Sequence, residues 1–127
     1  MVYLITGKAG AGKTHYAQAL AKELTDAGIS VATFDGDTFR AKNSNKDFTD
    51  KGRIKNLIDA AVLAREAERK GDVVILSFIA PKKEWRNMMR SFWMKSILVY
   101  IPGGTLWEGT TYEKPDNDEN SFWDNSI

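Results

Sequence analysis

The stretch Gly7–Thr14, GKAGAGKT, fits the phosphate-binding loop pattern G-x-x-x-x-G-K-[ST]. The apolar run Val2–Thr6 precedes it and predicts a buried strand, and Lys13–Ala27 is rich in good helix formers and stops before Gly28. In this context the glycines let backbone N–H groups turn toward phosphate oxygens, and the helix N-terminus adds partial positive charge. The stretch therefore predicts a phosphate-binding loop near the start of an α/β fold.

Each position of this loop has an expected role. Lys13 is expected to contact the terminal phosphates and Thr14 to offer its hydroxyl to Mg²⁺, so both would take part in binding ATP. The backbone cradle is expected to consist of Gly7, Gly10, Ala11 and Gly12. The single histidine, His15, follows the loop with no visible catalytic partner and is expected on the helix surface.

Beyond the loop, strand and helix patterns alternate. Further apolar runs predict strands over residues 31–34, 73–79 and 97–101, and helices are predicted over residues 53–70 and 82–93, with a loop over residues 41–52. The run VVILSFI is continuously apolar, as in a strand that is covered on both faces. The alternation predicts a three-layer P-loop fold, with a small parallel sheet of about four strands between helices.

The composition is that of one globular domain over residues 1–127. Residues 104–127 carry six acids and one lysine, a net charge of −5, which leaves +6 on residues 1–103 because the whole chain carries +1. The basic part suits an anionic ligand. The acidic C-terminal segment has the composition of a disordered tail, and whether it is ordered is left open. The chain has no cysteine, no apolar run long enough to span a bilayer and no leader pattern, so we expect a cytoplasmic protein without a membrane partner.

Switches, motors and group-transfer enzymes all use such a loop. A GTPase switch needs an N-K-x-D motif, and Asn45–Asp47 is one residue short of it. A motor ATPase usually places an acid after an apolar strand to organise Mg²⁺, whereas Ser77 follows VVIL here. Small group-transfer kinases remain, and these need acids near the transfer point and arginines that neutralise charge.

Clusters with these side chains follow the predicted strands. They are DGDTFR (Asp35–Arg40), FTDKGRIKN (Phe48–Asn56) and SFIAPKKEWRNMMR (Ser77–Arg90). Ligands of parallel α/β sheets bind at the carboxyl ends of the strands, so we expect these clusters to converge on the phosphate-binding loop. The sequence thus predicts a kinase site with a donor side and an acceptor side.

Together these stretches resemble adenylylsulfate kinases, which transfer the γ-phosphate of ATP to the 3′-hydroxyl of adenosine 5′-phosphosulfate. The resemblance covers about residues 2–101, in order and with similar spacing. The family motif D-G-D-x-x-R appears as DGDTFR, and G-F-S-x-x-D-R-x-x-N-I-R-R appears as DFTDKGRIKNLID. The family motif S-F-I-S-P-x-R-x-x-R-x-x-x-R appears as SFIAPKKEWRNMMR.

The resemblance implies roles for the matching residues. Lys13, Asp37 and Arg40 would be catalytic, with Asp37 acting on the acceptor hydroxyl or, through water, on Mg²⁺. The acceptor nucleotide would be bound by Asp37, Arg40, Phe48, Arg53, Asn56, Ile79 and Ala80. Among these, Phe48 would stack on the base. Arg86 and Arg90 would face nucleotide phosphates or acidic residues of the fold itself.

The chain also departs from the family pattern. Ala80 replaces the serine before the proline, and Leu57–Asp59 replaces I-R-R, so that a carboxylate stands where the family has a cation. After the fourth predicted strand the lid of the family is missing, although residues 109–115 resemble its G-x-x-x-x-Y-E-x-P stretch. A site without a lid excludes water less well and would admit a larger acceptor.

Two other functions are kept as alternatives. One is a small virus-type kinase of a nucleotide or of a hydroxymethylated base in DNA, for which Trp85, Phe92 and Trp93 would contact nucleic acid unless they belong to the core. The other is a nucleotide-binding regulatory module without catalysis, which the intact Lys13 and Asp37 disfavour. A homodimer is left open.

Overall fold

The computed structural model describes residues 1–42, 49–106, 111–119 and 122–125. Its elements in chain order are β1 (Val2–Thr6), α1 (Lys13–Asp26), β2 (Val31–Asp35), α2 (Gly36–Lys42), α3 (Asp50–Arg69), β3 (Val73–Ser77), α4 (Lys83–Arg90), β4 (Lys95–Tyr100) and β5 (Phe122–Asp124).

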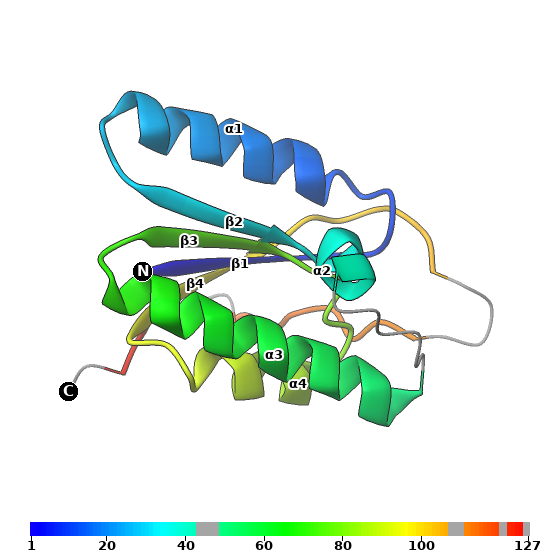
Figure 1. The fold of residues 1–127 in the computed structure, drawn as a ribbon. Helices are drawn as coiled ribbons and strands as arrows, with labels where there is room; N and C mark the ends of the chain where they lie inside the picture. Colours follow the sequence, from blue (N-terminus) through cyan, green and yellow to red (C-terminus); the bar gives the residue numbers. More distant parts are fainter. Residues whose placement is uncertain (43–48, 107–110, 120–121, 126–127) are drawn as a thin grey trace.

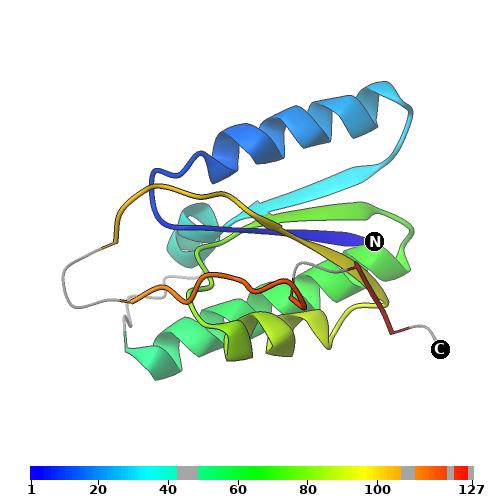
Figure 2. The same cartoon turned by 180° about the vertical axis from the view of Figure 1, so that it is seen from behind.

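The strands form one sheet in the order β2-β3-β1-β4-β5. The first four are parallel, and β5 pairs antiparallel with β4. Helix α1 covers one face of the sheet and helices α3 and α4 cover the other (Figures 1 and 2). This arrangement confirms the predicted α/β class with helices on both faces.

The core is divided between the two faces of the sheet. On the face of α3 and α4, Leu4 and Leu76 are fully buried with Ala60, Ala61 and Ala64 of α3, whose small side chains let the helix lie close to the strands. On the other face, the cluster consists of Ile5, Ile75 and Ala17, with partly buried residues of α1 against it. Both layers hold the carboxyl ends of β1 and β3 next to each other.

Several elements differ from the sequence prediction in their bounds or were not predicted. Part of the predicted loop over residues 41–52 is helical, because α2 extends to Lys42 and α3 begins at Asp50. The Thr49 hydroxyl oxygen accepts the N–H of Gly52 at 3.4 Å and caps α3. The sheet also has a fifth strand, β5, which is only three residues long.

The described part of the acidic C-terminal segment packs against the fold. Glu119 is 1% exposed and forms an ion pair with the fully buried Arg86. Asp116 pairs at the surface with Lys83. The hypothesis that this segment is disordered is therefore wrong for residues 111–119. No helix within the described ranges is long and apolar enough to cross a membrane.

Candidate active site

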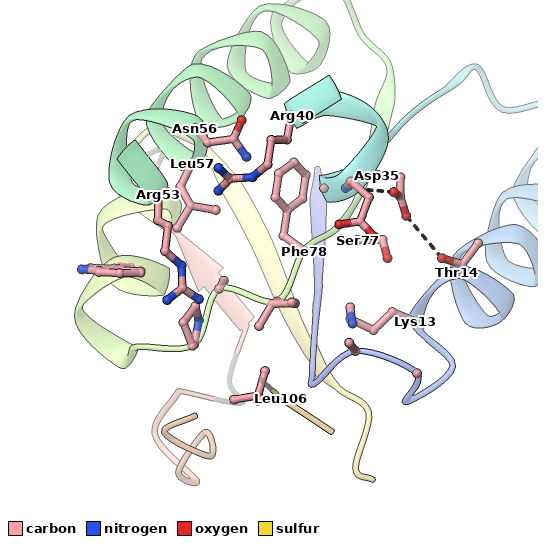
Figure 3. A pocket seen from close by; sticks show the side chains of 18 of the residues that line it. Lys13, Thr14, Asp35, Arg40, Arg53, Asn56, Leu57, Ser77, Phe78 and Leu106 are labelled. Atoms are coloured by element: carbon pink, nitrogen blue, oxygen red, sulfur yellow. Dashed lines mark hydrogen bonds between the residues drawn. The ribbon is translucent and has the colours of Figure 1, made fainter. Parts of the chain in front are cut away.

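A pocket of about 690 Å³ opens at the carboxyl ends of the parallel strands. Its lining comes from the phosphate-binding loop and the start of α1, from the β2–α2 junction, from α3 and from the residues that follow β3 (Figure 3). The predicted site residues in this lining are Gly10, Gly12, Lys13, Thr14, Asp37, Arg40, Arg53, Asn56, Ile79 and Ala80. The predicted convergence of the clusters on one pocket is thus observed.

The glycine-rich loop is held by the chain that follows β4. The N–H of Thr105 donates to the carbonyl of Ala9 at 2.8 Å. A Cβ atom on Gly7 would lie 2.5 Å from the carbonyl oxygen of Ile101, and one on Gly104 would lie 2.5 Å from that of Ala9. The backbones therefore approach at a distance that only glycine permits. Gly7 shapes the loop in this way without lining the pocket, and Ala11 is also outside the lining.

Lys13 lies at the start of α1 with its ammonium group curled back on the loop. Its Nζ donates to the carbonyl of Lys8 at 2.8 Å. Burial lowers the pKa of Lys13, while the carboxylates of Asp37 and Asp35 act in the opposite direction. The group is thus partly desolvated between the loop carbonyl and two acids, a setting in which an incoming phosphate would replace weak partners with a strong one.

Asp35, the last residue of β2, organises the neighbouring groups. Its Oδ2 accepts the Thr14 hydroxyl at 3.2 Å, and its Oδ1 accepts the backbone N–H groups of Asp37 and Thr38 at 3.1 and 3.3 Å (Figure 3). These two bonds cap α2. The site prediction did not include Asp35, although its place at the carboxyl end of a strand in DGD was a usable signal.

Hard oxygen donors in this corner suit Mg²⁺. In the described residues no group of three or more His, Cys, Asp or Glu forms a metal site of its own. Mg²⁺ in phosphoryl-transfer sites is commonly held by one or two protein oxygens, with phosphate oxygens and water completing the shell. Thr14 and Asp35, with Asp37 nearby in the lining, match that donor set.

On the far side of the pocket, Arg40, Arg53 and Asn56 extend from α2 and α3 toward one space (Figure 3). The Arg53 guanidinium lies 5.6 Å from the ring centre of Trp85. Asn56 is 4% exposed, and its Oδ1 has no hydrogen-bond partner in the described structure. The Oγ of Ser77 is buried in the same way. Buried oxygens without partners in a pocket lining suit donors from a bound ligand.

Some candidates lie elsewhere. Phe48 is outside the described residues. Arg86 and Arg90 are fully buried, and neither belongs to the pocket lining. Arg86 binds the Glu119 carboxylate, and Arg90 donates to the backbone carbonyl of Glu119. His15 is exposed on α1, as expected.

The aromatic residues of α4 and the chain after it belong mainly to the core. Trp85 is 6% exposed and Trp93 is 1% exposed, and the indole N–H of Trp93 donates to the carbonyl of Ala61 at 3.0 Å. Phe92 is partly buried against the same cluster. The departure Asp59 pairs with Lys55 at 2.9 Å and is outside the pocket lining, which has Leu57 instead.

A glycine-rich loop between a central parallel strand and a helix, with a pocket at the strand ends, defines a P-loop nucleotide-binding protein. Within that class, the family model for adenylylsulphate kinase matches residues 1–105. The chain belongs to the adenylylsulphate kinase family, as its motifs predict.

Individual relatives agree with this assignment. A probable adenylyl-sulfate kinase of Archaeoglobus fulgidus is 37% identical over 78% of this chain and 64% of its own length. One of Aeropyrum pernix is 41% identical over 71% of this chain and 50% of its own length. The chain thus spans between half and two thirds of these two curated relatives.

A solved structure shows the same fold. The APS kinase of Mycobacterium tuberculosis in complex with AMPPNP and APS superposes with a TM-score of 0.74. The two chains are 26% identical, and the match covers 80% of this chain and 61% of that one. The P-loop kinase fold is therefore shared over most of the present chain.

Proposed function

We propose that the protein is an ATP-dependent kinase that transfers the γ-phosphate to the 3′-hydroxyl of adenosine 5′-phosphosulfate. The observation that supports this most is the single pocket that joins Lys13 and Thr14 to Arg40, Arg53 and Asn56. The family membership points to the same reaction. One end of this pocket has groups that bind phosphate, and the other end has the cations Arg40 and Arg53. Such a pocket suits two anionic nucleotides placed end to end.

On the donor side, the loop backbone would hold the β-phosphate and Lys13 the γ-phosphate. Thr14 and Asp35 would hold Mg²⁺, directly or through water. When bound, Mg²⁺ would neutralise charge on the β- and γ-phosphate oxygens. The hydrogen bond between Thr14 and Asp35 keeps the Thr14 hydroxyl oxygen next to the Asp35 carboxylate, at the end of the phosphate-binding loop.

On the acceptor side, Asp37 would take the proton of the 3′-hydroxyl or orient that group. The 3′-oxygen forms a bond to the γ-phosphorus, and the bond between that phosphorus and the β–γ bridging oxygen breaks, releasing ADP. Arg40 and Arg53 would bind the phosphosulfate group, and Asn56 would accept a hydrogen bond from the acceptor. Ile79 and Ala80 would line its pocket, and stacking by Phe48 stays a prediction.

The test is transfer of labelled γ-phosphate to a panel of acceptors: adenosine 5′-phosphosulfate, free nucleotides, and DNA with hydroxymethylated bases. We expect transfer to adenosine 5′-phosphosulfate, its loss in Lys13→Ala and Asp37→Asn, and normal activity in the surface control His15→Gln. All three variants should remain folded by circular dichroism. Activity that survives in both site variants would show that these roles are wrong.

The panel also separates the alternatives. Transfer to DNA alone would overturn the proposed acceptor. Burial leaves Trp93 unsuited to stacking on bases, whereas Trp85 lines the pocket. ATP binding without transfer to any acceptor would favour the regulatory module. Cytoplasmic location and a homodimer stay predictions, to be tested by fractionation and by light scattering.

A further inference from the structure

We propose that the segment Tyr112–Glu119 positions the acceptor side of the pocket. It fixes the three consecutive carbonyl groups of Ile79–Pro81, the loop that lines the acceptor half. It acts on the first two through Thr6 and Arg86 and on the third through its own backbone. This inference rests on the proposed function, because it concerns the geometry that the acceptor meets. The residues involved would be positioning residues, which touch neither nucleotide.

The first of these carbonyl groups is held through a pair of hydroxyls. Thr6 is fully buried at the end of β1, and its Oγ1 donates to the carbonyl of Ile79 at 2.6 Å. The same Oγ1 lies 2.7 Å from the Tyr112 hydroxyl. A threonine hydroxyl has one hydrogen, which goes to Ile79, so Tyr112 must be the donor of the second bond.

The surroundings of Tyr112 keep it in the donor state. Burial raises the pKa of Tyr112, so the phenol holds its proton beyond the ordinary range. Its ring stacks on Tyr100 at 5.9 Å between centres, and the Arg86 guanidinium lies 5.5 Å from its centre. The hydroxyl is thus aimed at Thr6 by two contacts with the ring.

The other two carbonyl groups are held by Arg86 and by the segment backbone. Arg86 Nη1 donates to the carbonyl of Ala80 at 2.7 Å, and the N–H of Glu113 donates to that of Pro81 at 2.7 Å. Arg86 is itself fixed by Glu119, to which Nε and Nη2 donate at 2.5 and 3.1 Å. It also donates to the carbonyl of Glu113 at 2.7 Å.

The loop needs this support because its backbone is strained. Ala80 has φ of 42°, and it is the one non-glycine residue with positive φ in the described part of the chain. Such a conformation is unfavourable for a residue with a Cβ atom and persists only where surrounding contacts enforce it. The hydrogen bonds to the carbonyl groups of Ile79, Ala80 and Pro81 enforce this conformation. Losing them should let the pocket wall relax.

The experiment compares variants that differ by single hydroxyl groups. At nearly constant volume, Tyr112→Phe removes the bond to Thr6, and Thr6→Val removes that bond and the bond to the Ile79 carbonyl. We expect each to raise KM for adenosine 5′-phosphosulfate about 10-fold while KM for ATP changes less than about twofold. Thr6→Ser, which keeps the hydroxyl, should restore the wild-type value. Tyr100→Phe is the matched control, because its hydroxyl bonds nothing in the described structure.

Equal rises in both KM values, or failure of Thr6→Ser to rescue, would overturn the inference and indicate general loss of structure. If the wild type transfers phosphate to no acceptor, the proposed function fails, and hydrogen exchange then decides on the positioning. Peptides over residues 78–82 should exchange at least about 10-fold faster in Tyr112→Phe and Thr6→Val than in Thr6→Ser. Unchanged exchange would overturn the positioning itself.

Discussion

Asp35 carries two structural duties with its two carboxylate oxygens: one caps α2 and the other receives the Thr14 hydroxyl. It therefore ties the phosphate-binding loop to the helix that presents Asp37 and Arg40 to the pocket. A single side chain in this position can set the distance between the donor and acceptor sides.

The substitution Asp35→Asn tests the proposed role of Asp35 in binding Mg²⁺ separately from its role as the N-cap of α2. Asparagine caps helices about as well as aspartate, so Asp35→Asn should fold normally but lose negative charge beside Thr14. We expect the Mg²⁺ concentration for half-maximal activity to rise roughly 10- to 100-fold. Asp59→Asn, outside the pocket, is the control and should behave as wild type. An unchanged Mg²⁺ requirement would assign the metal to other groups.

Lys13 leads to a prediction on pH. Burial lowers its pKa, so Lys13 loses its proton at a lower pH than an exposed lysine does. ATP affinity should be full below this lowered pKa and should fall as the pH rises through it. Calorimetric titrations from neutral to alkaline pH would show the fall, and Lys13→Arg should abolish it because arginine keeps its charge. An affinity that is flat up to the ordinary lysine range would contradict this.

At this scale the sequence predicted most of the pocket. Lys13, Thr14, Asp37, Arg40, Arg53 and Asn56 lie in the lining because their motifs follow strand ends that a parallel sheet brings together. Asp35 was missed because its function depends on a bond to Thr14, 21 residues away. For Arg86 and Arg90 the sequence did not decide between binding nucleotide phosphates and binding acids of the fold itself. It does not reveal which group a buried arginine contacts.

At the scale of elements, the chain after β4 contacts the phosphate-binding loop and helps to shape it. Thr105 bonds Ala9, and Gly104 lies against the loop backbone. The connection after β4 thus lies directly beside the phosphate-binding loop, and Leu106 reaches the pocket.

Neighbouring glycines in this connection allow a matched comparison. Gly103 and Gly104 both have positive φ, but an added Cβ meets nothing within 4 Å at Gly103 and backbone atoms at 2.5 and 2.9 Å at Gly104. Gly104→Ala should therefore shift the loop and weaken ATP binding more than about 10-fold. Gly103→Ala should cost only about 1 kcal/mol of stability and leave ATP binding unchanged. Equal ATP affinities would show that the loop adapts to the connection.

The C-terminal segment leads to a prediction on stability. Glu119→Ala would leave Arg86 buried without its anion, which typically costs about 3–5 kcal/mol. Urea unfolding should therefore show a much lower midpoint. Lys83→Ala breaks an exposed pair in the same region and should leave the midpoint nearly unchanged. Similar shifts of the urea midpoint in both variants would mean that the buried ion pair contributes no more to stability than the exposed one.

At the scale of the whole molecule, we propose that the residues that the structure describes form one cooperative unit, which includes residues 111–119 of the acidic segment. Its two buried arginines depend on it, since Arg90 donates to the carbonyl of Glu119 at 2.5 Å, and burial lowers the pKa of Arg90 to about 10. The predicted α/β class followed from alternation of strands and helices. The fifth strand and the burial of Glu119 did not, because three residues carry no periodicity and an acidic composition usually indicates exposure.

Deleting residues 111–127 tests this unity. We expect the shortened chain to lose its cooperative thermal transition, because Arg86 and Arg90 would both lose their bonds to Glu119. The carbonyl of Pro81 would lose its bond to Glu113 at the same time. Far-ultraviolet circular dichroism during heating would measure this. A shortened chain with a sharp transition and intact ATP binding would show that the segment is an appendage.

The bond between Arg86 and Glu119 also affects the order of events at the ribosome. The two residues are 33 positions apart, which at 5 to 20 residues per second is roughly 2 to 7 s of translation. The nascent chain gains its fourth parallel strand, β4, within that interval. Until Glu119 is added, it holds a cation whose counterion has not been synthesised. The protein must therefore complete its fold late, and a chaperone that shields α4 until Glu119 emerges would raise its yield.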